Sequence, residues 1–130
     1  MGQYLILIYT DEASWAAIGE QEAGAVLAAH QRFGQEHGAV LRGGGWLQPT
    51  ATATTLRRPD GRERDDFAGG EDALVTDGPY VETKEALGGY YLIEVPDLDT
   101  ALRVARDVPE PFGGVEVRPL RPSVQEYQGS

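Results

Sequence analysis

The sequence predicts an α+β fold in which two helices cover one face of an antiparallel sheet. One observation is the order of the expected elements, β-α-β-β-(β)-β-α-β, which is typical of a ferredoxin-like split βαβ unit. A second is that the strands expected at 4–9 and 89–95 are apolar on both faces. The third is the length of 130 residues without a repeat or a linker, which indicates a single domain over 1–130.

The first half of the chain contains two strands and a helix. Residues 4–9, YLILIY, are aromatic and β-branched and predict the first strand. Residues 13–18 are expected to add a short helical turn. Apolar residues then recur at three- and four-residue steps over 20–37, which predicts an amphipathic helix. The strand expected over 40–47 carries three successive glycines, which indicate a bulge or a close backbone approach.

The second half returns to the sheet and ends on an edge strand. A charged, glycine-containing stretch over 57–73 is expected to be a long surface excursion. Asp97 is placed to cap a helix that begins at Leu98. Residues 115–118 alternate between apolar and charged side chains, as an edge strand with one wet face does. Two shorter strands are expected at 52–56 and 73–76.

The apolar second face of the sheet predicts a partner. Two helices cannot cover both faces, so something outside the chain is expected to cover the other one. A second copy is the simplest candidate. Two sheets packed across a two-fold axis would form a homodimeric α+β barrel.

Composition excludes several classes of function. The net charge of −10 repels a phosphate backbone, so we expect no nucleic-acid partner. The longest apolar run is too short to span a bilayer, so we expect no membrane partner. The absence of cysteine excludes disulfides and thiolate metal sites, and the N-terminus lacks a secretory leader, which together favour the cytoplasm. No motif indicates a metal or another cofactor.

Of the two histidines, His30 is the candidate for chemistry. It shares its helical face with Val26, Leu27 and Phe33, which places the imidazole against the sheet. A buried histidine with a carboxylate partner can transfer protons near neutral pH, although it can equally be a core residue bonded to a backbone carbonyl. His37, at the helix end, is interpreted as a charge favoured by the helix dipole.

The densest group of polar residues lies at 77–85, DGPYVETKE. Asp77 can bond back to the amides of the Gly-Pro turn, and Lys84 is the only lysine beside ten arginines. A lysine can act as a desolvated base, although an ion pair with a neighbouring glutamate is the simpler interpretation. The aromatic residues that could line a pocket, or could simply belong to the core, are Trp46, Tyr80, Tyr90 and Tyr91.

The same segment, followed by LGGYYLIE at 87–94 and PDL at 96–98, resembles the signature of the DGPF-domain branch of the YCII-related (YciI-like) proteins. The resemblance extends over nearly the whole chain, through 4–9, 48–55 and 115–120. Tyr80 stands where the family signature has phenylalanine. The resemblance implies a ferredoxin-like dimeric barrel and a small bacterial cytoplasmic protein, some relatives being encoded beside extracytoplasmic-function sigma factors.

The resemblance also implies a histidine–aspartate pair between helix and sheet. His30 matches the histidine of that pair, but residues 46–50, WLQPT, contain no acid where the relatives have the aspartate. Asp77 or Glu82 would have to replace it.

Two hypotheses about function follow. In the first, the protein is a homodimer that binds or converts an unidentified small molecule. His30 and Asp77 would act as acid and base, and the substrate would be bound by Trp46, Tyr80, Glu82, Lys84 and Tyr91. In the second, the protein is a non-catalytic accessory module of a sigma-factor pathway, and the motif is an interaction surface or a structural turn.

Overall fold

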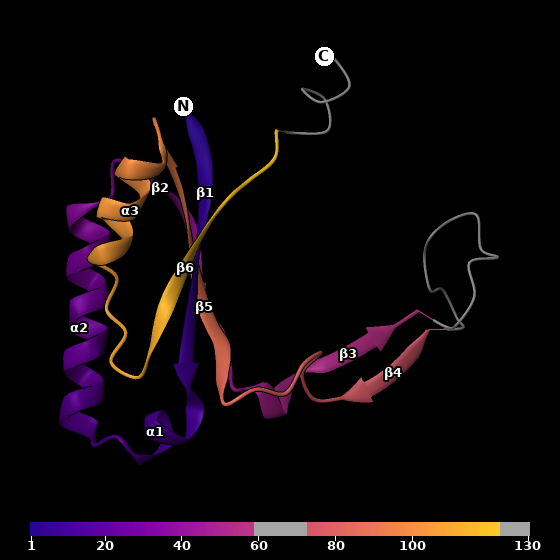
Figure 1. Ribbon diagram of the computed structural model, residues 1–130. Helices are drawn as coiled ribbons and strands as arrows, with labels where there is room; N and C mark the ends of the chain where they lie inside the picture. The colour runs from indigo at the N-terminus through magenta and orange to yellow at the C-terminus, as the bar shows by residue number, and fades with distance from the viewer. Residues whose placement is uncertain (59–72, 123–130) are drawn as a thin grey trace. The chain divides into compact units, whose positions relative to one another are not determined.

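The computed structural model describes residues 1–58 and 73–122 and shows an α+β architecture (Figure 1). The chain divides into two compact units, one formed by Met1–Leu47 with Glu85–Ser130 and the other by Gln48–Lys84. Each unit is described by itself below. Most of the surface excursion expected over 57–73 lies outside the described residues.

The first unit is built on a four-stranded antiparallel sheet. Its strands lie in the order β2-β5-β1-β6, so β1 and β5 are central. This places the two strands with continuous apolar sequence where both neighbours are strands, as expected. The bounds are β1 Gly2–Asp11, β2 Leu41–Trp46, β5 Glu85–Val95 and β6 Gly113–Pro119.

Three helices complete the first unit, and the two longer ones lie on the same side of the sheet (Figure 1). They are α1 Glu12–Ala17, α2 Glu20–Glu36 and α3 Leu98–Arg106. The predicted cap is confirmed, because the Asp97 carboxylate accepts hydrogen bonds from both the backbone N–H and the hydroxyl of Thr100. Among the described residues, no helix is both long enough and apolar enough to cross a bilayer.

The core lies between the sheet and these helices. Ile6 of β1 and Ile93 and Val95 of β5 are fully buried there, and Phe33 of α2 is nearly so. From α3 the core receives Ala101, Val104 and Ala105. The predicted apolar stripe of α2 thus packs on the sheet, with Phe33 as its buried anchor.

The opposite face of the sheet is also apolar. Leu5 and Leu7 alternate with the buried Ile6 and Ile8, and their cross-strand partners on β5 are Leu92 and Tyr90. Directly paired residues of an antiparallel sheet point to the same face. The apolar side chains of this second face on β1 and β5 are therefore Leu5, Leu7, Tyr9, Leu87, Tyr90 and Leu92, and the polar pair Gln3–Glu94 lies beyond them on the same face.

The glycines of β2 mark the close approach that the sequence predicts. A Cβ on Gly44 would lie 2.9 Å from the Tyr91 ring, and one on Gly45 would lie 3.0 Å from the Tyr90 ring. The predicted irregularity is present as well, because the β2–β5 register shifts between Leu41 and Gly43. Two neighbouring tyrosines can therefore lie flat against β2, one on each face.

The described part of the second unit contains a 3₁₀ turn, Thr50–Thr52, and an antiparallel pair, β3 Thr54–Arg57 with β4 Leu74–Asp77. The strand predicted over 52–56 is thus wrong at its start, because the chain between Pro49 and Ala53 closes a turn. Gly78 follows β4 with a φ of +99°, a conformation that side chains disfavour. Its N–H donates to Ala53.

Candidate functional site

The first unit contains a pocket between α2 and the sheet, with a volume of about 270 Å³. Its walls come from the ends of β1 and β2, from the middle of β5 and from one face of α2. The lining is mostly apolar and includes Ile8, Trp15, Val26, Leu27 and Trp46 with three glycines of β2 and β5. The polar side chains that line it are Thr10, His30, Tyr91 and Glu110. Few polar groups in an apolar cavity are typical of small-molecule sites.

His30 and Tyr91 form the polar pair of this pocket. The Nδ1 atom of His30 lies 2.7 Å from the Tyr91 hydroxyl oxygen, and the two rings are stacked with centroids 5.9 Å apart. The sequence predicts both residues as site residues, and the structure brings them together. Their contact joins residues that are far apart in the chain, so periodicity alone could place each residue on its face but could not pair them.

Burial keeps this pair neutral. Desolvation lowers the pKa of His30 below its ordinary value of 6.5, although a hydrogen bond to the Pro109 backbone and the charge of Glu110 both act to raise it. Desolvation also raises the pKa of Tyr91. Because a proline backbone offers only a carbonyl acceptor, both contacts of His30 are satisfied when Nε2 carries the proton and the Tyr91 hydroxyl donates to Nδ1.

Glu110 is the acid that the first unit supplies. Its Oε2 atom accepts hydrogen bonds from the Thr10 hydroxyl at 2.9 Å and from the Phe112 backbone N–H at 2.8 Å. Both donors hold the carboxylate at the pocket wall, close enough for its charge to act on His30. Sequence reasoning missed this residue because it lies between Pro109 and Pro111, in what reads as a simple connection. The signal was the pair of prolines, which restrict the backbone on both sides of an acid.

Two tryptophans form the aromatic part of the lining. Trp46, predicted as a site residue, is 69% exposed, and Trp15, which the sequence did not indicate, packs against it with ring centroids 6.2 Å apart. Phe112 meets Trp15 edge-on at 6.0 Å. The interpretation of Trp46 as a core residue is therefore wrong, because most of its ring faces solvent.

The other predicted site residues, Asp77, Tyr80, Glu82 and Lys84, belong to the second unit. The Thr55 hydroxyl donates to the Gly78 carbonyl at 2.7 Å. Arg57 donates to the Tyr80 carbonyl at 2.9 Å, and its guanidinium lies 4.1 Å from the centroid of the Tyr80 ring. Residues 78 and 80 of the motif thus contact β3 of their own unit. The pairing of Asp77 or Glu82 with His30 stays a prediction.

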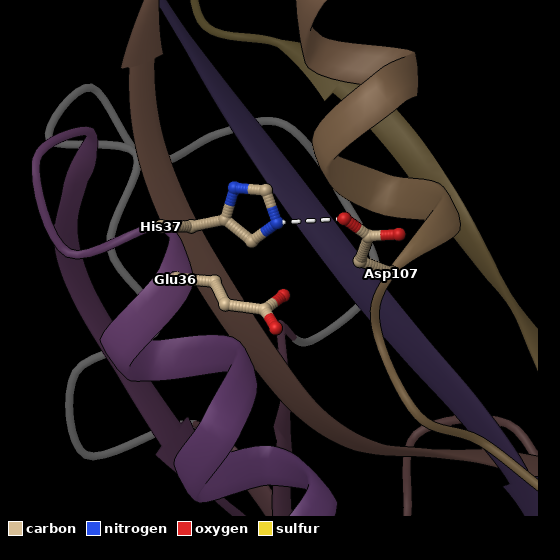
Figure 2. Close-up of side chains that lie close together, drawn as sticks. All are labelled: Glu36, His37 and Asp107. Atoms are coloured by element: carbon tan, nitrogen blue, oxygen red, sulfur yellow. Dashed lines mark hydrogen bonds and ion pairs between the residues drawn. The ribbon is translucent and has the colours of Figure 1, made fainter.

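A second cluster of ionisable residues lies where the C-terminal ends of α2 and α3 meet (Figure 2). The Nε2 atom of His37 lies 2.8 Å from Asp107 Oδ2, and Glu36 lies beside them so that one potential ligand atom of each residue falls within 4.8 Å of the others. These three residues could supply metal ligands. Because Glu36 and Asp107 are exposed, the arrangement equally suits a solvated ion pair that links two helix ends.

Comparison with known proteins identifies the family. The model of the YCII-related domain matches residues 2–123. An uncharacterised protein of Rhizobium meliloti (strain 1021) is 40% identical in an alignment 126 positions long, and the alignment covers 90% of each chain. The match includes both units and every residue of the pocket described above. The chain therefore belongs to the family of proteins with a YCII-related domain.

Proposed function

We propose that the first unit binds a small molecule in its pocket and transfers a proton there, with His30 as the acid and base. The 2.7 Å contact between His30 Nδ1 and the Tyr91 hydroxyl, inside an apolar cavity, carries this proposal. In this proposal Glu110 takes the role of the carboxylate. It lies on the pocket wall and its charge acts on the imidazole.

The geometry suits a relay of one proton. The lowered pKa of His30 keeps the ring neutral near pH 7, so Nδ1 can accept. A ligand O–H or N–H that donates to the Tyr91 oxygen would let the Tyr91 proton pass to Nδ1, while the ligand proton replaces it on the tyrosine. The resulting imidazolium is stabilised by the Glu110 carboxylate and by the Pro109 carbonyl. The return of the proton restores both side chains.

A thermal-shift screen of the protein against a metabolite library tests the proposal. A ligand of this pocket should stabilise the wild type and should lose most of that effect in His30→Ala and Tyr91→Phe. Gln31→Ala, an exposed neighbour on α2, should behave as the wild type. Glu110→Gln and Asp77→Asn then show which carboxylate acts together with His30. We expect only the first to weaken binding, and hits that tolerate both His30→Ala and Tyr91→Phe would contradict the proposal.

We further propose that the first unit is a ferredoxin-like unit that forms a homodimeric barrel. The strand order β2-β5-β1-β6, with a helix between β1 and β2 and another between β5 and β6, supports the first part. The apolar second face supports the second part, because Leu87 and Tyr90 remain 37% and 36% exposed on it. A second copy would cover this face with an identical one.

The turn at Asp77 to Tyr80 supports membership of the DGPF-domain branch and, with it, a cytoplasmic protein. One observation favours an accessory role in a sigma-factor pathway as the second candidate. The second unit exposes apolar side chains that a partner protein could cover, namely Leu56, Leu74, Val75, Tyr80 and Val81.

Calorimetry with an extracytoplasmic-function sigma factor as the probe distinguishes the two candidates. An accessory module should bind the sigma factor, should lose binding in Val75→Glu and should keep it in His30→Ala. An enzyme or a ligand-binding protein should show the reverse sensitivity in the small-molecule screen.

A further inference from the structure

The charge of the pocket restricts what it can bind. Among the described residues that line it, Glu110 is the one acidic residue, and neither lysine nor arginine is present. The net charge of the chain, −10, adds a negative background potential. An anionic ligand would have to bury its charge beside a carboxylate without a counterion, which is costly.

The Glu110 carboxylate has one oxygen atom that can accept a hydrogen bond from a ligand. Both of its hydrogen bonds, from Thr10 and Phe112, reach the same atom, Oε2. Within the described residues, Oε1 of Glu110 has no hydrogen-bond donor. A carboxylate oxygen held in this way can accept a charge-assisted hydrogen bond from an ammonium or amidinium group, and such bonds are stronger than neutral ones.

The aromatic lining favours the same kind of ligand. Trp15 and Trp46 are inclined at 48° with centroids 6.2 Å apart, so they present two indole surfaces at one end of the pocket. Indole faces attract cations through their quadrupole and also pack well on apolar rings. Trp46 is 69% exposed, an unusually high value for such a large side chain. Burial of that surface by a ligand would be favourable.

We infer that the pocket takes an organic cation, in which an ammonium or amidinium group binds Glu110 and an apolar or aromatic body packs against Trp15 and Trp46. This inference rests on the proposed small-molecule function and specifies its ligand class. The His30–Tyr91 pair is the second polar group of the pocket, and it can exchange a proton with the same ligand. The volume of about 270 Å³ suits a compact molecule.

Three probes of similar size and different charge test the inference. Benzylammonium, benzyl alcohol and benzoate share one ring, and their affinities can be measured from tryptophan fluorescence at pH 7.5. We expect benzylammonium to bind about tenfold or more tightly than benzoate, equivalent to about 1.4 kcal/mol. Glu110→Gln should abolish most of this preference, because it should weaken benzylammonium binding far more than benzyl alcohol binding. Asp99→Asn removes the same charge from an exposed position of α3 and should preserve the preference.

The outcomes that would contradict the cation inference differ from those that would contradict the proposed function. Equal or tighter binding of benzoate, or equal effects of Glu110→Gln and Asp99→Asn, would overturn the cation inference and leave the proposed proton-transfer site standing. If none of the three probes binds, the inference also fails, whereas the His30→Ala screen judges the proposed function separately. Should Glu110→Gln fail to fold, Trp46→Ala at the exposed rim replaces it. This substitution should weaken benzylammonium binding by about tenfold.

Discussion

At the scale of single residues, the two histidines show what periodicity can and cannot predict. The spacing on α2 correctly places His30 against the sheet, where it meets Tyr91. The partner of His37, Asp107, lies on another helix end and could not be read from spacing. Hydrogen bonds between distant segments depend on the packing of those segments, so the sequence predicts the face but not the partner.

The lowered pKa of His30 predicts an acid-sensitive fold. Below pH 6.5 the unfolded chain binds a proton at this residue that the folded protein resists, so the free energy of unfolding should fall as pH decreases from that value towards the lower folded pKa. His30→Gln should flatten this part of the profile, and Gln31→Ala should not. Urea unfolding at a series of pH values measures both. A wild-type profile that is flat or rises on acidification would contradict the desolvation argument.

Tyr91→Phe measures how much the Tyr91 hydroxyl contributes to the free energy of unfolding. The substitution keeps the ring and leaves the half-buried Nδ1 of His30 without its donor, so we expect a loss of about 1 kcal/mol in the free energy of unfolding. Tyr90→Phe is the matched control, because the neighbouring ring lies over Gly45 on the opposite face. Equal losses in the two variants would show that the hydrogen bond contributes little.

At the scale of elements, the sequence predicts most strands and helices, and its errors have local causes. Strand β5 begins at Glu85 and not at residue 89, because residues 85–87 also pair with β1 on the other side of an irregularity. The register of that pair shifts between Ile8 and Tyr9, which makes Gly88 the extra residue of a bulge. The sequence does not indicate that the connection between α3 and β6, which carries Glu110, belongs to the site, because its prolines predict only where the helix and the strand end.

Glycines in the sheet and in the helix should respond to alanine in opposite ways. A Cβ on Gly89 would lie 2.9 Å from the Gly45 carbonyl oxygen, so Gly89→Ala must force β2 and β5 apart and should cost about 1–3 kcal/mol. A Cβ on Gly24 of α2 would meet no atom within 4 Å, so Gly24→Ala should stabilise the protein by about 0.5–1 kcal/mol. Thermal melts monitored by circular dichroism measure both changes. A neutral Gly89→Ala would contradict the close approach of the two strands.

At the scale of the whole molecule, the sequence predicts an open sheet face but not what lies on it. Continuous apolar strands require cover on both faces, and that requirement is visible in Leu5 and Leu7 as much as in Ile6 and Ile8. The division into two units was not visible, because the charged stretch after β3 reads as a loop of one domain. The prediction of a single domain over 1–130 remains open to test. The molecule that covers this face contributes a surface of its own, and the pattern of apolar residues in the strands does not describe that surface.

The dimer provides the test at this scale. Light scattering coupled to size exclusion should give about twice the mass of one chain at micromolar concentration, as expected for a self-complementary apolar interface. Leu5 lies on the second face, paired with Leu92 on one side and Arg118 on the other, so Leu5→Lys should bury a charge beside a like charge between the two sheets and yield monomers. Leu102→Lys adds the same charge to an exposed position of α3 and should leave the dimer intact. Circular dichroism of both variants separates dissociation from unfolding, and a wild type that stays monomeric, soluble and folded would contradict the proposed barrel.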